Sequence, residues 1–181
     1  MEFIPTKFGD AWLIKPKVFQ DSRGFFLESY SKKLFETQGI NAEFVQDNHS
    51  LSANKGVLRG IHFQKPPHEQ AKLVRVTRGS VYDVIVDLRK NSPSYGQWQG
   101  FDLSAENFLL LFIPRGFGHA FCTLEDNTEF LYKTDGFYAP EFEGGLIWND
   151  PTLKIDWPIK DPVLSEKDQV LPKFVDFESP F

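Results

Sequence analysis

The sequence predicts a single all-β domain, a sandwich or barrel built from short strands with a few short helices. Its 181 residues lie within the usual length of one domain. The 12 Pro and 13 Gly residues are spread along the chain and divide it into short segments. The clearest segment, residues 81–89, alternates apolar and polar side chains with the period of two that a strand has. We therefore treat 1–181 as one domain.

The first half of the chain contains one helix signal and one predicted hairpin. Ser31 to Gln38 is a candidate helix, with Ser31 as N-cap and Gly39 as its stop. Leu73–Thr77 and Val81–Arg89 read as strands, and the turn at 78–80 is expected to join them as a hairpin. Within the second strand one face is apolar and the other carries charged side chains. The apolar face comprises Tyr82, Val84, Val86 and Leu88, and the charged face Asp83, Asp87 and Arg89.

The second half continues the pattern of short strands. Leu109–Ile113 is an apolar run that Pro114 ends, which predicts a buried strand. Glu129–Lys133 and Gly145–Trp148 are further short strand candidates. Ser165–Asp168 has the form of a capping box and predicts a turn of helix. The tail from residue 171, rich in Pro and Phe, is expected to pack along the surface.

Composition excludes several classes of protein. The net charge is −5 and no basic cluster is dense enough to follow a nucleic-acid backbone, so we expect no nucleic-acid partner. The longest apolar run, Phe108–Ile113, is far shorter than the ~20 residues of a membrane-spanning helix. The N-terminus has no secretory signal pattern, and the single cysteine, Cys122, indicates a reducing compartment. We therefore expect no membrane association and a cytoplasmic location.

Two segments resemble the halves of the cupin signature. Ile113–His119 matches the core P-x-G-x-x-H of the second cupin motif, in which Pro and Gly turn the chain so that the His projects inward from the next strand. Gly56–Gln64 matches the first motif, G-x5-H-x-H, except that Gln64 replaces its second His. This resemblance implies a cupin-type jelly roll.

The cupin motifs raise the question of a metal site. His62, Glu69 and His119 stand near the positions of three metal ligands, and three protein ligands can hold a catalytic metal. Gln64, however, is a poor substitute for an imidazole ligand. Spacing alone therefore disfavours a metal site without excluding it.

A set of polar residues on predicted strands points to a different ligand. They are Arg59, His62, Lys72, Arg75, His119, Tyr132 and Asp168. Such groups inside a barrel are costly unless they are paired or face a ligand. Cations beside aromatic rings suit a nucleotide, because the cations bind phosphates and the rings stack on the base. Taken singly, each residue also has a structural explanation, such as a surface ion pair or a capping carboxylate.

The segments that contain these residues resemble the dTDP-4-dehydrorhamnose 3,5-epimerase family over nearly the whole chain. The matching runs keep a common order and spacing. They include Asp21–Glu28, Gln46–Ser50, Gly56–Gln64, Gln70–Val76, Asp83–Arg89, Leu103–Asn107, Ile113–Phe121, Tyr132–Lys133, Tyr138–Glu143 and Leu164–Asp168. The resemblance implies a homodimer that needs no metal and no other cofactor. It also implies a dTDP-4-keto-6-deoxy sugar nucleotide as substrate.

The resemblance assigns four catalytic roles. The C3 and C5 protons of the sugar both flank the C4 ketone, so removal of either gives an enolate. His62 would be the base, since an unperturbed imidazole pKa near 6.5 suits proton abstraction at neutral pH. Asp168 would orient His62, and Lys72 would stabilise the enolate oxygen. Tyr132 would donate the proton to the opposite face of the sugar.

The resemblance also assigns substrate contacts. Arg23, Arg59 and Lys167 would lie near the diphosphate and nucleotide, and Phe26 and Tyr138 would stack on thymine. Further contacts would come from Glu28, Gln46, Asn48, His119 and Glu143. In relatives, the segment that carries Arg23 to Glu28 reaches into the partner subunit's site. Members of the family often have Gly at the position of Ala120, so we expect its methyl group to shift His119 slightly.

Three other functions remain open at this stage. A related epimerase that acts at only one carbon would share His62, Lys72 and Tyr132. A metal-dependent cupin, such as a dioxygenase or isomerase, would lose its activity to chelators. A sugar-binding cupin without catalytic activity would bind dTDP and exchange no sugar protons. The order of epimerisation, the nucleotide tolerance and the final sugar of the pathway are not encoded in recognisable motifs.

Overall fold

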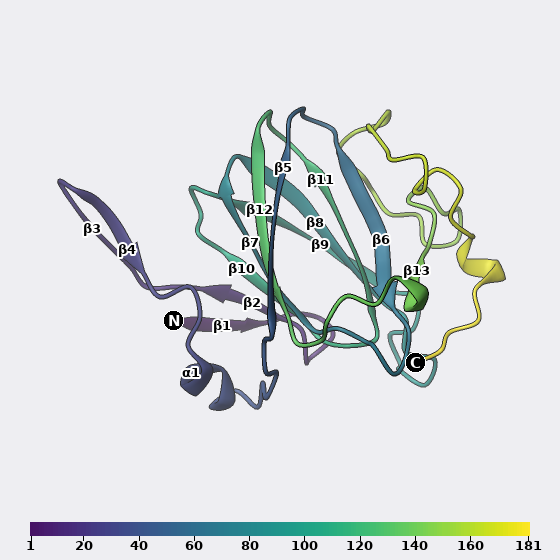
Figure 1. The fold of residues 1–181 in the computed structure, drawn as a ribbon, viewed down its shortest axis with the longest axis horizontal. Coiled ribbons are helices and arrows are strands. Elements are labelled where there is room, and N and C mark those ends of the chain that lie inside the picture. The colour runs from purple at the N-terminus through teal and green to yellow at the C-terminus, as the bar shows by residue number, and fades with distance from the viewer.

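Two antiparallel sheets face each other in the computed structural model, which describes residues 1–181 (Figure 1). In spatial order, the six-stranded sheet consists of β1 (Glu2–Pro5), β2 (Trp12–Lys15), β10 (Leu110–Ile113), β7 (Lys72–Arg78), β12 (Thr128–Thr134) and β5 (Gln46–Ser52). The five-stranded sheet consists of β13 (Glu143–Gly145), β6 (Leu58–Gln64), β11 (Phe117–Thr123), β8 (Ser80–Asp87) and β9 (Trp98–Ser104). The predicted all-β jelly roll is confirmed.

A few short elements complete the fold. Strands β3 (Val18–Asp21) and β4 (Gly24–Leu27) form a separate two-stranded arm. The only α-helix is α1 (Lys32–Glu36), and 3₁₀ turns occupy Pro140–Phe142 and Phe174–Asp176. No helix here approaches the length and apolar character needed to cross a membrane.

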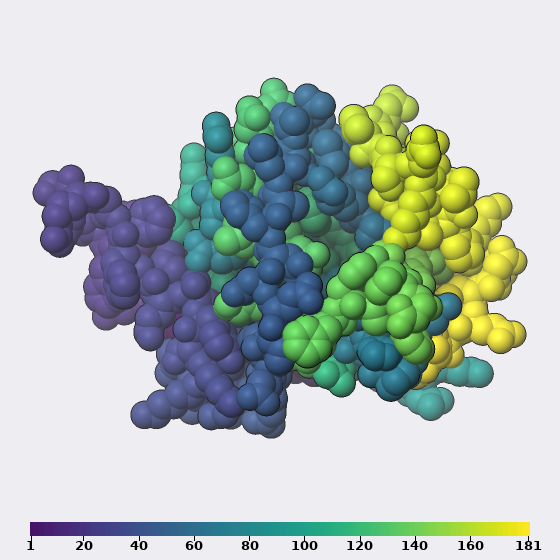
Figure 2. All heavy atoms as spheres, viewed as in Figure 1, coloured from purple at the N-terminus to yellow at the C-terminus, as the bar shows by residue number.

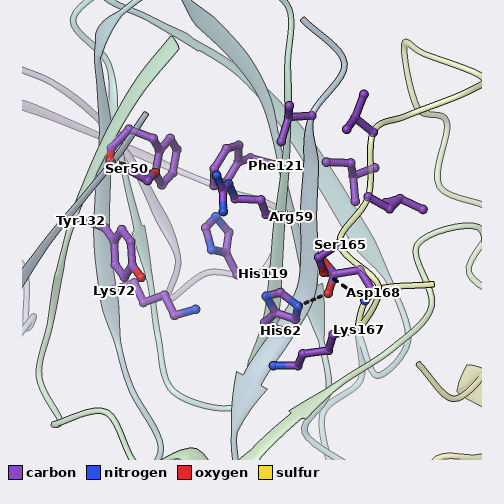
Figure 3. A pocket seen from close by; sticks show the side chains of 15 residues that line it. Ser50, Arg59, His62, Lys72, His119, Phe121, Tyr132, Ser165, Lys167 and Asp168 are labelled. Atoms are coloured by element: carbon purple, nitrogen blue, oxygen red, sulfur yellow. Dashed lines mark hydrogen bonds and ion pairs between the residues drawn. The ribbon is translucent and has the colours of Figure 1, made fainter. Parts of the chain in front are cut away.

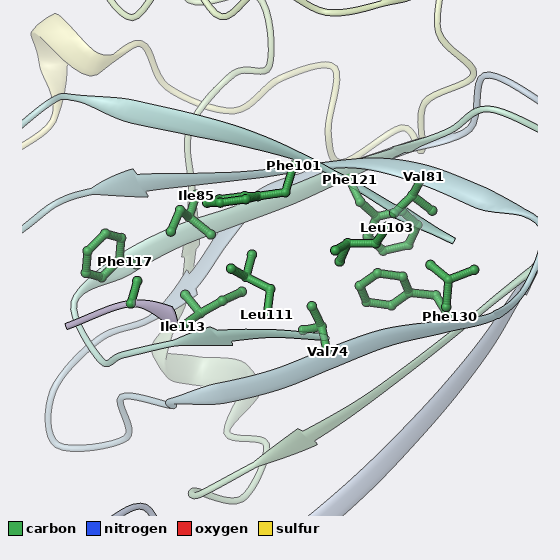
Figure 4. Close-up of a cluster of buried hydrophobic side chains, with 12 residues drawn as sticks. Val74, Val81, Ile85, Phe101, Leu103, Leu111, Ile113, Phe117, Phe121 and Phe130 are labelled. Carbon is green, nitrogen blue, oxygen red and sulfur yellow. The ribbon is translucent and has the colours of Figure 1, made fainter. Parts of the chain in front are cut away.

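The main core fills the space between the two sheets (Figure 4). Val74, Leu111 and Phe130 enter it from the six-stranded sheet, and Ile85 and Phe121 enter it from the five-stranded sheet. The rings of Phe121 and Phe130 stack with centroids 4.1 Å apart and so join the two sheets directly. This apolar filling occupies one part of the interior and leaves the rest to polar side chains.

Strand β8 corrects two expectations. The predicted hairpin at 78–80 does not form, because β7 belongs to the six-stranded sheet and β8 to the five-stranded sheet. The turn at Gly79, with φ of +73°, therefore carries the chain from one sheet to the other. Asp83 and Asp87 were expected on a polar face, but both are completely buried. Burial of these carboxylates requires hydrogen-bond partners inside the protein.

The apolar face of β8 is covered by the C-terminal segment. Val84, Val86 and Leu88 lie in a second core cluster, against which Phe177 and Phe181 of the tail pack. The expectation that the tail packs along the surface is thus confirmed, and Figure 1 shows it as the yellow segment beside the five-stranded sheet. The segment that carries Asp168 is held separately, through backbone hydrogen bonds of Val163 with Gly56 and Leu58.

Two predicted elements differ in extent from the observed ones. Helix α1 ends at Glu36, and the side chain of its N-cap, Ser31, forms no capping hydrogen bond. The candidate strand 145–148 overlaps β13 only at Gly145, although Leu146 still exchanges two backbone hydrogen bonds with Ile61. The predicted bounds of two buried strands agree more closely with the structure. Leu109–Ile113 corresponds to β10 and Glu129–Lys133 lies within β12.

Asp150 anchors the C-terminal segment, and its replacement by alanine is expected to destabilise the fold by about 3 kcal/mol. The buried Asp150 carboxylate accepts hydrogen bonds from the backbone N–H groups of Thr152, Leu153 and Phe174 at 2.7 to 2.8 Å. Chemical denaturation would measure the loss. Asp156→Ala, an exposed change in the same segment, is the matched control. Equal stabilities of the two variants would contradict the prediction.

Candidate active site

A pocket of about 440 Å³ opens between the two sheets and is bordered by the C-terminal segment (Figure 3). Its lining mixes cations, two imidazoles and aromatic rings. The lining residues are Ser50, Val57, Leu58, Arg59, His62, Lys72, His119, Phe121, Phe130, Tyr132, Val163, Leu164, Ser165, Lys167 and Asp168. Seven of the sequence-predicted site residues therefore meet in one cavity: Arg59, His62, Lys72, His119, Tyr132, Lys167 and Asp168.

His62 and Asp168 form a hydrogen-bonded pair at the edge of the pocket. His62 lies on β6, and its Nε2 is 2.6 Å from Asp168 Oδ1. Ser165 supports the turn, because its Oγ accepts the backbone N–H of Asp168 at 3.2 Å. The turn at 165–168 thus forms one half of the predicted capping box. The carboxylate of Asp168 faces His62 instead of returning to the backbone of Ser165.

This pairing defines the chemistry of the imidazole. A neutral His62 that donates Nε2–H to the Asp168 carboxylate keeps Nδ1 free to accept a proton. Burial raises the pKa of Asp168, but the hydrogen bond from His62, together with those of Ser165 and the Gly60 backbone, outweighs this effect and lowers the pKa below its usual value. Asp168 therefore stays anionic and can stabilise the imidazolium that proton uptake creates.

Lys72 and Tyr132 enter the pocket from the six-stranded sheet, opposite His62 (Figure 3). Burial lowers the pKa of Lys72 to about 8, against the opposing charges of Asp83 and Glu143. Burial also raises the pKa of the Tyr132 hydroxyl, although the charge of Arg59 partly opposes this. Near neutral pH the pocket therefore holds an ammonium group and a phenolic acid facing an imidazole.

His119 lies beside His62, because the two residues are partners in the pairing of β11 with β6. Its ring stacks near Phe130, with centroids 6.1 Å apart. Ala120, the next residue, is completely buried in the cluster on the outer face of the five-stranded sheet, with Ile61 and Val84. The Ala120 side chain thus packs on the face of β11 away from the pocket.

The rim of the pocket carries a chain of polar contacts. Lys167 Nζ lies 2.5 Å from Glu143 Oε1, and the Tyr138 hydroxyl donates to Glu143 Oε2 at 3.1 Å. The backbone N–H of Tyr138 donates to Gln46 Oε1 at 3.3 Å, and Gln46 Nε2 donates to Asn48 Oδ1 at 2.9 Å. Tyr138 itself is exposed. Lys167 lines the pocket, whereas Gln46, Asn48 and Tyr138 line a smaller hollow that shares Tyr132 with it.

The three predicted contacts on the arm do not reach the pocket of their own chain. Arg23, Phe26 and Glu28 are all exposed, and none of them lines the pocket. Arg23 instead pairs with Asp21 on the same arm, at 2.6 Å. Figure 2 shows the arm standing clear of the body of the molecule.

Gln64, the residue that replaces a cupin metal ligand, is a buried structural group. Its Nε2 donates to the carbonyls of His68 and Phe137, and its Oε1 accepts the backbone N–H of Ala139. No group of three or more His, Cys, Asp or Glu side chains is placed to hold a metal ion. The side-chain amide of Gln64 thus links the loop that follows β6 to the loop that follows β12.

Sequence reasoning misplaced one residue and missed another. Arg75 was expected to face inward with Lys72. Arg75 lies three positions after Lys72 on β7, however, and so is on the opposite face of the strand. There it lines a separate hollow on the outer face of the six-stranded sheet. Asp83 was not recognised as part of the site, although it bonds His119. An acidic residue between Val81 and Ile85 on an inward strand face was the available signal.

Comparison with known proteins gives consistent results. The family model described as dTDP-4-dehydrorhamnose 3,5-epimerase matches residues 5–176. The dTDP-4-dehydrorhamnose 3,5-epimerase of Shigella flexneri is 52% identical over 177 residues, which cover 97% of this chain and 97% of that protein.

Solved structures agree with the sequence relatives. The dTDP-4-dehydrorhamnose 3,5-epimerase from Bacillus anthracis str. Ames, with TDP and PPi bound, superposes with a TM-score of 0.94 at 51% identity, covering 96% of this chain and 99% of that one. The dTDP-6-deoxy-D-glucose-3,5-epimerase from Legionella pneumophila, in complex with dTDP-4-keto-L-rhamnose, superposes with a TM-score of 0.93 at 44% identity, covering 98% and 94%.

Proposed function

The chain belongs to the dTDP-4-dehydrorhamnose 3,5-epimerase family, and from this premise we propose how its pocket works. The protein is an isomerase that epimerises C3 and C5 of dTDP-4-dehydro-6-deoxy-D-glucose to give dTDP-4-dehydro-L-rhamnose. The observation that carries the mechanism is the placement of the His62–Asp168 pair and Tyr132 on opposite sides of one pocket. Inversion at carbon needs a base on one face and an acid on the other.

In the proposed mechanism His62 Nδ1 removes the proton at C3 or C5, and the electron pair moves onto the C4 oxygen to form an enolate. Asp168 stabilises the imidazolium that results. The Lys72 ammonium stabilises the negative charge on the enolate oxygen. Tyr132 then donates its hydroxyl proton to the opposite face of the same carbon, which inverts the centre. Both carbons flank the same ketone, so the same groups serve both inversions without a metal or cofactor. Between the two inversions His62 releases its proton to solvent and Tyr132 takes one up.

The remaining predicted residues would hold the nucleotide. The cations Arg59 and Lys167 line the pocket and suit the diphosphate, since charge-assisted hydrogen bonds to phosphate oxygens are strong. The exposed Tyr138 ring at the rim suits stacking on thymine, and Gln46, Asn48, His119 and Glu143 supply further polar contacts. We assign the reaction to the cytoplasm, which the free buried thiol of Cys122 supports.

The same proposal includes a homodimer in which each arm completes the pocket of the other subunit. The exposed rings of Phe19 and Phe26 support this, because they lie 6.4 Å apart on an arm that stands clear of its own domain, and exposed apolar patches mark protein contacts. Arg23 on the arm would then reach the partner's bound diphosphate, and Phe26 and Glu28 would contact the rest of the nucleotide.

Mixing two impaired variants would test the arm exchange. Arg23→Ala is expected to raise KM about tenfold through loss of a phosphate contact, and His62→Ala to remove the base. A heterodimer of the two has one pocket with His62 and an intact partner arm, so its activity at low substrate is expected to exceed that of either variant alone. If each arm served its own pocket, mixing would restore nothing.

The activity is expected to decline above pH 8. Lys72 must carry a proton to stabilise the enolate, and its pKa lies at about 8. The pKa of Tyr132 is raised above its usual 10, so the acid stays protonated throughout this range. In Lys72→Arg the guanidinium keeps its charge, and the decline should disappear even if kcat is lower. Measurement of kcat from pH 6 to 10 gives both profiles, and a flat wild-type profile up to pH 9.5 would contradict this role.

Deuterium exchange tests the reaction itself. The protein would be incubated with dTDP-4-dehydro-6-deoxy-D-glucose in D2O with a chelator, and C3 and C5 followed by proton NMR. We expect deuterium at both carbons together with the L-lyxo product. Deuterium at one carbon only would indicate a mono-epimerase. Exchange at neither carbon would overturn the enolate mechanism for this substrate.

A further inference from the structure

Asp83 is a buried charge beside the site for which the mechanism above has no use. It lies on β8 in the interior, and its side chain is completely buried. His119 Nε2 lies 3.1 and 3.0 Å from its two carboxylate oxygens, and no other hydrogen bond to this carboxylate occurs within the chain. Asp83 does not itself line the pocket. It therefore reaches a bound substrate only through its neighbours.

The contact sets the proton position on His119. A carboxylate can only accept, so the imidazole must donate through Nε2–H. Burial lowers the pKa of His119, and the charge and hydrogen bond of Asp83 oppose that change only in part. The ring is then neutral, and Nδ1 is a hydrogen-bond acceptor. His119 thus differs from Lys72, which can only donate.

Lys72 has no ion-pair partner of its own, because its ammonium makes no hydrogen bond or salt bridge within the chain. The charged and titratable groups around it come from the strands that border the pocket. They are Asp83 on β8, His119 on β11, His62 and Arg59 on β6, Tyr132 on β12 and Glu143 on β13. Asp83 and Glu143 are the two acidic groups among them. Glu143 is already neutralised by Lys167 at 2.5 Å, which leaves Asp83 as the carboxylate without a cationic partner.

We propose that Asp83 is a positioning residue for the epimerase, which holds His119 as a neutral acceptor and keeps Lys72 cationic next to the C4 oxygen. The site then contains two imidazole–carboxylate pairs with different tasks. In the His62–Asp168 pair the ring takes up protons from the sugar. In the His119–Asp83 pair the ring keeps its proton, and the carboxylate acts as counter-charge to Lys72. This inference rests on the proposed role of Lys72.

Asp83→Asn tests the charge and preserves the shape, because the Asn oxygen can still accept the His119 proton. Loss of a nearby negative charge lowers the pKa of an ammonium group, so the decline of kcat at alkaline pH is expected about one pH unit lower than in the wild type. At pH 9 kcat should then be roughly tenfold lower than in the wild type. KM for the nucleotide sugar should change less than kcat, since Asp83 does not itself line the pocket and the Asn side chain still accepts the hydrogen bond of His119.

Asp87→Asn is the matched control. Asp87 is completely buried on the same strand and the same face, but Arg89, Ser92 and Ser94 hold its carboxylate away from the pocket. Its variant is expected to lose stability and to keep the wild-type pH profile. An Asp83→Asn protein that folds and shows the wild-type profile would overturn the proposal while leaving the epimerase activity established.

A measurement on the unmodified protein keeps the test independent of how the variants fold. Long-range ¹H–¹⁵N NMR of the imidazoles reports which nitrogen is protonated. At pH 7.5 we expect His119 as the neutral tautomer with the proton on Nε2. A proton on Nδ1, or a doubly protonated ring, would overturn the inference even if deuterium exchange had confirmed the reaction.

Discussion

Replacement of His62 by alanine is expected to abolish deuterium exchange at both C3 and C5 and to lower kcat by about 10³- to 10⁴-fold. General bases typically contribute about 10²- to 10⁴-fold, and here one base serves both carbons. The change also removes the hydrogen bond between the imidazole and the buried Asp168 carboxylate, which makes the site still less suited to proton transfer. Single-turnover assays in D2O would measure exchange and conversion together.

His49→Ala is the control for this experiment. His49 is an exposed histidine on β5 that pairs with Glu129 at 3.3 Å, outside the pocket. It is expected to leave exchange unchanged. Continued exchange at one carbon in the His62→Ala protein would reveal a second base and would contradict the proposal that one imidazole serves both positions.

Replacement of Tyr132 by phenylalanine is expected to separate exchange from inversion. The ring still packs near Phe130, with centroids 6.2 Å apart in the wild type, so only the hydroxyl is lost. His62 can still remove a proton and return a deuteron to the same face. We therefore expect deuterium incorporation with retained configuration, and a fall in product formation of about 10²- to 10⁴-fold.

The control variant is Tyr95→Phe. Tyr95 packs on Phe174 of the tail, with centroids 5.2 Å apart, and is not part of the pocket. It should convert substrate at the wild-type rate. Product formation at that rate in Tyr132→Phe would assign the acid to another group, while loss of exchange as well would mean that the hydroxyl contributes to proton abstraction.

The sequence by itself determined the class of fold and the local turns. The signals are period-two alternation, Pro and Gly at segment ends and the P-x-G-x-x-H motif. Each depends on only a few neighbouring residues, so it can be recognised in the sequence without tertiary contacts. Gly116 adopts the left-handed conformation with φ of +83°, and His119 then follows on β11 and lines the pocket, as the motif predicts. The resemblance over nearly the whole chain named seven residues that share the cavity.

Only the tertiary structure decided which partners these residues take. His62 and Asp168 are 106 positions apart, and their contact depends on how the C-terminal segment packs on the five-stranded sheet. The turn at Gly79 has the local signature of a hairpin, yet the strands on either side join different sheets. The physical reason is the same in both cases. Turn residues and apolar alternation determine the local course of each strand. Which segments pack against one another follows instead from the apolar surface that distant parts of the chain bury together.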